Sequence, residues 1–178
     1  MRAIAAPSDR RAAFRGAALV IGVVAAASLA GATPPASELR PLAIPVEGVR
    51  VADLRDTFDE VRAGRRHEAI DIAAPRGTRV VAVDDGTVAK LFTSIPGGRT
   101  VYQFDPGQRF AYYYAHLDRY ADGLREGGVL RRGDLIGYVG STGNARADAP
   151  HLHFAVFRLG PARRWWKGEP INPFGALH

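Results

Sequence analysis

The sequence contains no cysteine and only one methionine among its 178 residues. Without cysteine the chain folds without disulfides, and any metal site has to be built from histidine, aspartate, glutamate or water. A convincing long helical pattern is also lacking after the first 32 residues. These absences exclude thiolate metal chemistry and a helical bundle.

What the sequence does contain is a series of short β-prone runs separated by turn residues. Pro-Arg-Gly, Asp-Asp-Gly and Asp-Pro-Gly stand between them, and such clusters form tight turns. The spacing predicts an all-β fold, a compact antiparallel β-sandwich or barrel-like domain. For residues 51–63 a short helical turn and a loop both fit the irregular apolar spacing. The expected strands are Ala69–Ala73, Thr78–Val83, Thr87–Phe92, Thr100–Phe104, Phe110–Leu117, Asp134–Val139 and His151–Arg158.

The first 32 residues have the pattern of an export segment. Four arginines precede the apolar run 17–30, and Ala30-Gly31-Ala32 is a small-residue cleavage pattern. This order is typical of a secretory signal peptide. An uncleaved membrane anchor over residues 16–32 is the alternative, because 17 residues are at the short limit for spanning a bilayer. No cysteine follows the apolar run, which excludes a lipoprotein anchor.

Charge and proline content then divide the remainder of the chain. The formal net charge is +6, and it falls to +3 without the four arginines and one aspartate of residues 1–32. A mildly basic exported domain suits an anionic envelope polymer or a membrane surface, although ordinary solubility explains the charge equally well. We expect a proline-rich linker over residues 33–50, a domain over residues 51–178, an exported location in the periplasm or cell envelope, and no nucleic-acid partner.

The segment His151-Leu152-His153 is the most informative part of the expected domain. Side chains alternate along a strand, so the two imidazoles lie on one face while Leu152 and Phe154 face the core. Two nitrogen ligands on one rigid face are half of a metal site, although many such pairs are incidental.

The other histidines of the domain also have distinctive neighbours. If residues 66–72 are extended, His67, Ala69 and Asp71 share one face, and the small Ala69 leaves room for a cation between the imidazole and the carboxylate. His116 ends a tyrosine-rich strand and is of interest only if its face looks onto the same groove. A catalytic zinc takes three protein ligands and needs further polar groups for proton transfer.

Three motifs in order resemble one family. H-x-x-x-D in RRHEAIDIAAPRGT, the YAHL segment, and PHLHF preceded by GDLIGYVGSTGN strongly resemble the lysostaphin-type (LytM-like) zinc metallopeptidases, over roughly residues 41–177. The resemblance implies zinc ligands His67, Asp71 and His153. It implies that His116 and His151 act as general base and transition-state stabiliser, without assigning which does which.

The resemblance also implies hydrolysis of peptide cross-links or stems of bacterial peptidoglycan, with peptidoglycan peptides as substrates. The sequence departs from the family pattern at one position, because Ala69 stands where H-x-G-x-D usually has glycine. The added methyl group reaches toward the groove, or bars a positive φ that glycine would allow. The competing hypotheses are a non-catalytic wall-binding module or regulator of other wall hydrolases that uses the same groove, and a metal-storage or sensing domain. An envelope regulatory partner is a separate expectation.

Overall fold

The structure is a computed structural model that describes residues 39–178. The predicted export segment and residues 33–38 of the predicted linker lie outside these residues. Within residues 39–178 the only helical elements are two short 3-10 turns, and no helix is long and apolar enough to span a membrane. The predicted all-β fold is confirmed. Its elements are η2 (Val51–Asp53), β1 (Val61–Arg62), β2 (Arg65–Arg66), β3 (Ile70–Ala73), β4 (Arg79–Val81), β5 (Gly86–Ser94), β6 (Gly98–Phe104), β7 (Phe110–Tyr120), β8 (Val129–Leu130), β9 (Leu135–Val139), β10 (His151–Leu159), β11 (Gly168–Ile171) and η3 (Phe174–Ala176).

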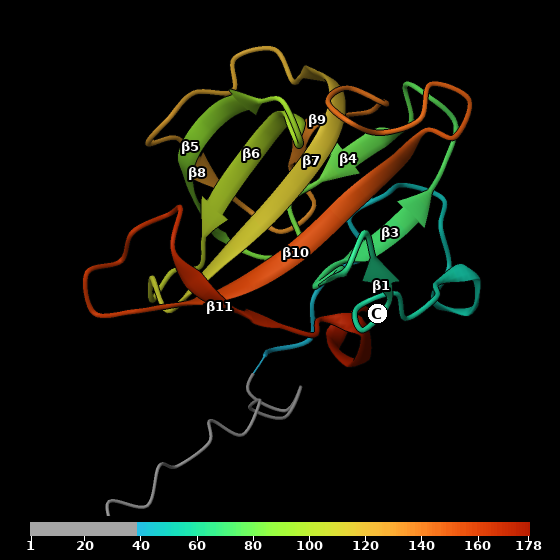
Figure 1. Ribbon diagram of the computed structural model, residues 1–178. Helices are drawn as coiled ribbons and strands as arrows, with labels where there is room; N and C mark the ends of the chain where they lie inside the picture. The colour runs from blue at the N-terminus through green and yellow to red at the C-terminus, as the bar shows by residue number, and fades with distance from the viewer. Residues whose placement is uncertain (1–38) are drawn as a thin grey trace, which may run out of the picture. The chain divides into compact units, whose positions relative to one another are not determined.

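Nine of the strands form one curled antiparallel sheet (Figure 1). The main path is β11-β10-β7-β6-β5-β8, with β3 added to β10 and with β9 joining β7 to β4. Strands β1 and β2 make a separate two-stranded hairpin. The long strands β7 and β10 run side by side through the middle of the sheet, and β3 pairs with the first half of β10.

Each of the seven strands expected from the sequence is present, with boundaries that differ by a few residues. They correspond to β3, β4, β5, β6, β7, β9 and β10. Four further strands were not predicted. Three of these contain only two residues, and β11 has the sequence GEPI, whose glycine and proline are depleted in strands.

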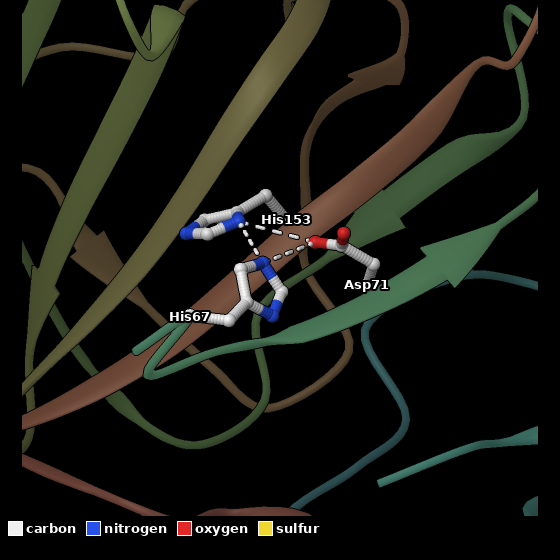
Figure 2. A group of neighbouring side chains, drawn as sticks. All are labelled: His67, Asp71 and His153. Carbon is white, nitrogen blue, oxygen red and sulfur yellow. Dashed lines mark hydrogen bonds and ion pairs between the residues drawn. The ribbon is translucent and has the colours of Figure 1, made fainter. Parts of the chain in front are cut away.

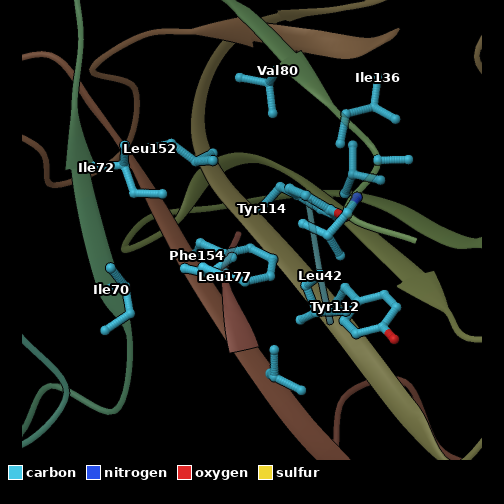
Figure 3. Packing of buried hydrophobic residues seen from close by; sticks show 14 of the residues in the cluster. Leu42, Ile70, Ile72, Val80, Tyr112, Tyr114, Ile136, Leu152, Phe154 and Leu177 are labelled. Atoms are coloured by element: carbon cyan, nitrogen blue, oxygen red, sulfur yellow. The ribbon is translucent and has the colours of Figure 1, made fainter. Parts of the chain in front are cut away.

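Figure 3 shows part of the hydrophobic core. It lies on the face of the sheet opposite to the two histidines of β10, because burial alternates along the first residues of that strand. Alternation along β10 buries Leu152, Phe154 and Val156, as the sequence predicts, and Tyr112 and Tyr114 of β7 pack on the same side. Burying such large side chains is the main stabilising contribution to a domain of this kind. It also fixes which face of β10 carries the histidines.

Two buried tyrosines connect this core to a polar network. The Tyr114 hydroxyl accepts a hydrogen bond from the Val83 amide at 3.0 Å and donates one to Gln103 Oε1 at 2.7 Å. Gln103 Nε2 donates to the Asp84 carbonyl at 2.6 Å, and the Tyr112 hydroxyl donates to the Asp84 carboxylate at 3.0 Å. No buried side-chain nitrogen or oxygen within residues 39–178 lacks a partner. The network therefore avoids the cost of unpaired buried polar groups.

The described part of the predicted linker packs against the domain. Leu42 forms an isolated parallel bridge with Leu177, and Val46 forms an antiparallel bridge with Val80. Both Leu42 and Val46 are buried, and both belong to the hydrophobic core. From residue 39 onward the chain is thus part of the packed structure.

This packing predicts a large effect of truncating Leu42. Leu42→Ala removes a fully buried side chain, so we expect the free energy of unfolding to fall by about 2–5 kcal/mol in denaturant titrations. Val51→Ala is the matched control, because Val51 is 51% exposed and its loss should change stability by less than about 0.5 kcal/mol. Equal effects of the two substitutions would show that residues 39–50 add nothing to the core.

Candidate metal centre and active site

Strand β10 brings the candidate site together through its pairing with two neighbours. His153 lies directly opposite Asp71 of β3 on one side and Ala115 of β7 on the other. Directly opposed residues of antiparallel strands have neighbouring side chains on one face. His151, two positions earlier, faces the same cleft as His153, as the alternation predicts.

Three side-chain atoms form a nearly equilateral triangle at this point (Figure 2). His67 Nε2 lies 3.1 Å from Asp71 Oδ1 and 3.1 Å from His153 Nδ1. His153 Nδ1 lies 3.1 Å from Asp71 Oδ1. These are the three residues that the sequence resemblance implies as ligands, and the structure identifies them as a group able to hold a metal ion.

The size of the triangle fits a tetrahedral ion. Ligands about 2.0–2.1 Å from a tetrahedral zinc ion lie roughly 3.3 Å apart, close to the separations observed here. Two imidazole nitrogens and one carboxylate oxygen are also a donor set that zinc accepts, with the fourth position left for water or substrate.

Thr57 holds two of these three residues, His67 through its side chain and Asp71 through its backbone. Its carbonyl oxygen lies 3.0 Å from His67 Nδ1; a carbonyl only accepts, so Nδ1 carries the proton and Nε2 presents its lone pair to the site. The Thr57 hydroxyl accepts a hydrogen bond from the Asp71 amide at 3.1 Å and donates one to the Ala69 carbonyl at 3.0 Å. Nothing in the sequence around Thr57 marks this role.

The local geometry of His67 differs from the expectation of one continuous strand. Strand β3 begins only at Ile70, and Glu68 has a left-handed φ of 58°. His67 reaches Asp71 across this bend and not along a shared strand face. Ala69 is buried, is absent from the cleft lining, and has no positive φ. The expectation that its methyl group reaches toward the groove was therefore wrong.

His116 reaches the cleft by a similar departure from regular strand geometry. Alternation would place it with Tyr112 and Tyr114, which are core residues, but its φ is 61° and the β7 pairing shifts register around it. A left-handed residue in a strand turns its side chain to the other face at some cost in strain. His116 thus lines the same cleft as Ala115.

The loop between β9 and β10 and the turn between β5 and β6 hold His116 in this position. Its Nδ1 donates to the Thr142 carbonyl at 2.8 Å, and the Thr142 hydroxyl donates to the Leu117 carbonyl at 2.8 Å. Gly98 and Gly143 both have positive φ, and a Cβ on Gly143 would lie 2.3 Å from the Gly98 nitrogen. The glycines allow the two loops to meet backbone to backbone behind His116.

His116 and His151 form an adjacent pair, with ring centroids 4.9 Å apart. The His151 Nδ1 donates to the Ala149 carbonyl at 2.9 Å, and its Nε2 lies 3.8 Å from Asp71 Oδ2. Burial lowers the pKa of His116 to about 4, against the opposing effect of its bond to the Thr142 carbonyl. At neutral pH the His116 imidazole is consequently neutral, with its Nε2 able to accept a proton.

Arginine also enters the cleft, which has a volume of about 500 Å³. Arg62 Nη1 donates to Asp71 Oδ2 at 2.5 Å and lies 3.0 Å from His67 Nε2. Burial raises the pKa of the Asp71 carboxyl, but hydrogen bonds from His153 and Arg62 outweigh it and hold that pKa below its usual range. The sequence analysis did not anticipate Arg62, although Arg62-Ala63-Gly64-Arg65 has turn chemistry that could have predicted a hairpin.

All five predicted site residues therefore meet in one cleft. The remaining histidine, His178, is exposed at the C-terminal end and does not line that cleft.

Comparison with known proteins agrees with this arrangement. Among curated relatives, the DD-carboxypeptidase/endopeptidase Mpg of Neisseria meningitidis serogroup B (strain MC58) is 38% identical over 110 residues, covering 61% of this chain and 22% of the relative. The L-Ala--D-Glu endopeptidase of Bacillus subtilis is 32% identical over 119 residues, covering 62% of this chain and 36% of the relative. The chain thus spans well under half the length of these relatives.

Solved structures show the same fold. Helicobacter pylori Csd3, from its orthorhombic crystal, aligns with a TM-score of 0.61 and 28% identity, covering 78% of this chain and 35% of that one. LytU aligns with a TM-score of 0.57 and 28% identity, covering 71% of this chain and 85% of that one. The model of Peptidase family M23 matches residues 65–173, which is more than half of the sequence. The chain, with its lysostaphin-like fold, belongs to peptidase family M23.

Proposed function

We propose that this protein is a zinc-dependent endopeptidase that hydrolyses peptide bonds of bacterial peptidoglycan. The observation that carries the proposal is the triangle of His67 Nε2, Asp71 Oδ1 and His153 Nδ1 with two further imidazoles in the same cleft. Metal storage would need the triangle but not the neighbouring pair. The complete set of five residues favours catalysis over a purely wall-binding or regulatory role.

Zinc would be held by His67, Asp71 and His153. When bound there, it supplies a water of pKa about 7 and polarises a substrate carbonyl. The protein contributes a rigid ligand set, since two of the three residues stand directly opposite each other on β3 and β10.

Proton transfer falls to His116 and His151. Peptide hydrolysis requires a group that accepts the proton of the attacking water and one that donates a proton to the leaving amine. In both imidazoles Nδ1 donates a hydrogen bond to a backbone carbonyl, so Nε2 is the ring nitrogen that is left for proton transfer. A neutral Nε2 accepts a proton, and the resulting imidazolium donates one or stabilises the negative oxygen of the tetrahedral intermediate.

The choice of substrate is supported by the relatives and by charge. The two curated relatives described above are named DD-carboxypeptidase/endopeptidase and L-Ala--D-Glu endopeptidase, and members of peptidase family M23 hydrolyse peptidoglycan. An export segment at residues 1–32 would deliver the domain to the cell envelope, where its net charge of +3 suits an anionic polymer. We include anchoring through residues 16–32 and an envelope regulatory partner in this proposal.

The first test concerns the metal. His153→Ala removes one of three ligands, so we expect loss of bound zinc and of peptidoglycan hydrolysis, measured by elemental analysis and by release of soluble muropeptides. His178→Ala is the matched control, because His178 is outside the cleft, and it should keep about one zinc per chain and full activity. Hydrolysis by metal-free His153→Ala protein would refute the mechanism.

The second test separates proton transfer from metal binding. His116→Ala leaves all three proposed ligands in place, so the zinc content should stay at the wild-type level. Hydrolysis should fall by about 100-fold or more, because a proton-transfer group is lost. Wild-type turnover in this variant would show that His116 has no catalytic role, while loss of zinc would show a structural one.

The third test concerns Thr57. Thr57→Val keeps the shape of the side chain but removes the hydroxyl that binds the Asp71 amide, so we expect zinc affinity to fall by about 10–100-fold. Thr57→Ser keeps the hydroxyl and should bind zinc like the wild type in a chelator competition titration. Equal affinity of the Val and Ser variants would exclude a positioning role for this hydroxyl.

A further inference from the structure

Arg62 contacts the same atoms that the metal ion would use. Its Nη1 lies 3.0 Å from His67 Nε2 and 2.5 Å from Asp71 Oδ2. The Thr57 carbonyl fixes the proton of His67 on Nδ1, so Nε2 has a single lone pair that points into the site. That lone pair accepts the Arg62 hydrogen bond.

One lone pair cannot serve two partners at once. A guanidinium that donates to His67 Nε2 occupies the direction in which a metal ion must bind, and guanidinium and divalent cation also repel each other. Asp71 does not impose the same exclusion, because Arg62 contacts Oδ2 while Oδ1 is the corner of the ligand triangle. His67 is therefore the point at which the two cations exclude one another.

Glu60 is a second anionic partner of Arg62, and the side chain contacts it at the same time as it contacts His67 and Asp71. Arg62 Nη2 and Nε both donate to Glu60 Oε2, at 2.6 and 3.2 Å. Strands β1 and β2 contain two residues each and pair with no other strand of the described chain. Val61 is 74% exposed, so a shift of the Arg62 side chain away from His67 disturbs little core packing.

We propose that Arg62 is a resident cation of the metal-free site, which competes with the metal ion for His67 and, when the ion binds, gives up His67 while it stays paired with Glu60. The inference rests on the metal site of the proposed function. In the metal-free protein Arg62 offsets the charge of Asp71 and holds the ligands together. Its presence also lowers the affinity for zinc, because each ion that binds must displace it.

The experiment compares Arg62→Gln with the wild type and with Arg66→Gln. Arg66 is on the same hairpin, lines the same cleft and pairs with Asp59, whereas the hydrogen bonds to His67 and Asp71 from this hairpin come from Arg62. Arg66→Gln thus removes the same charge without removing the competing contact. Zinc affinity is measured by competition with a chromogenic chelator, and thermal unfolding is measured with and without zinc.

We expect Arg62→Gln to bind zinc about tenfold more tightly than the wild type, since a charge-assisted hydrogen bond no longer has to be broken. Its metal-free form should unfold at a lower temperature than the metal-free wild type, and the zinc-loaded forms should unfold together. Arg66→Gln should match the wild type in both measurements.

The direction of the change in zinc affinity of Arg62→Gln tests the inference. Weaker zinc binding by Arg62→Gln would overturn the inference and show that Arg62 supports Asp71 in the loaded site. Unchanged binding would overturn it as well, and would leave Arg62 outside the metal equilibrium. A wild-type protein that binds no zinc would refute the proposed function itself, which separates the two failures.

Discussion

The register of β10 between β3 and β7 is the constraint on which the site depends. His153 faces Asp71 across one strand boundary and Ala115 across the other. A slip of one residue would turn both histidines of β10 into the core and bring Leu152 into the cleft. The register is held by the opposite face, where Leu152 and Phe154 are fully buried. Packing of the core and placement of the candidate ligands Asp71 and His153 are thus two results of one strand pairing.

Backbone carbonyls, more than side chains, determine which ring nitrogen of His67, His116 and His151 faces the cleft. Three carbonyls from two loops each accept a hydrogen bond from an Nδ1 atom: that of Thr57 from His67, and those of Thr142 and Ala149, both between β9 and β10, from His116 and His151. In all three the Nε2 atom is left for the cleft. A carbonyl is present whatever the residue, so this orientation depends on the path of the chain and tolerates changes of side chain.

The sequence predicted the regular parts of this molecule and the five residues that meet in the cleft. Strands with alternation, such as β3 and β10, were found because burial on one face leaves a pattern with period two. The positions of His67 and His116 followed from the family resemblance and not from periodicity, since each depends on a left-handed residue, at Glu68 and at His116 itself. Such a residue reverses the face that alternation assigns. Strain of this kind is imposed by distant loops and has no local sequence signal.

Thr57 and Arg62 escaped the sequence analysis for a different reason. Both act across the fold, from a segment that precedes the first ligand and has no regular structure long enough to recognise. Threonine and arginine are also common surface residues, so their types alone carry little information. Only the three-dimensional path of residues 54–66 shows that they belong to the centre.

The bridge between Leu42 and Leu177 has a consequence for how this domain can be combined with others. The Leu42 amide donates to the Ala176 carbonyl at 2.7 Å, and the His178 amide donates to the Leu42 carbonyl at 2.9 Å. The two ends of the described chain are therefore tied side by side. A domain with adjacent ends can be inserted into a surface loop of a host protein, or reconnected as a circular permutant through a short linker. In either arrangement the new junction lies at the Leu42–Leu177 bridge, whose residues do not line the histidine cleft.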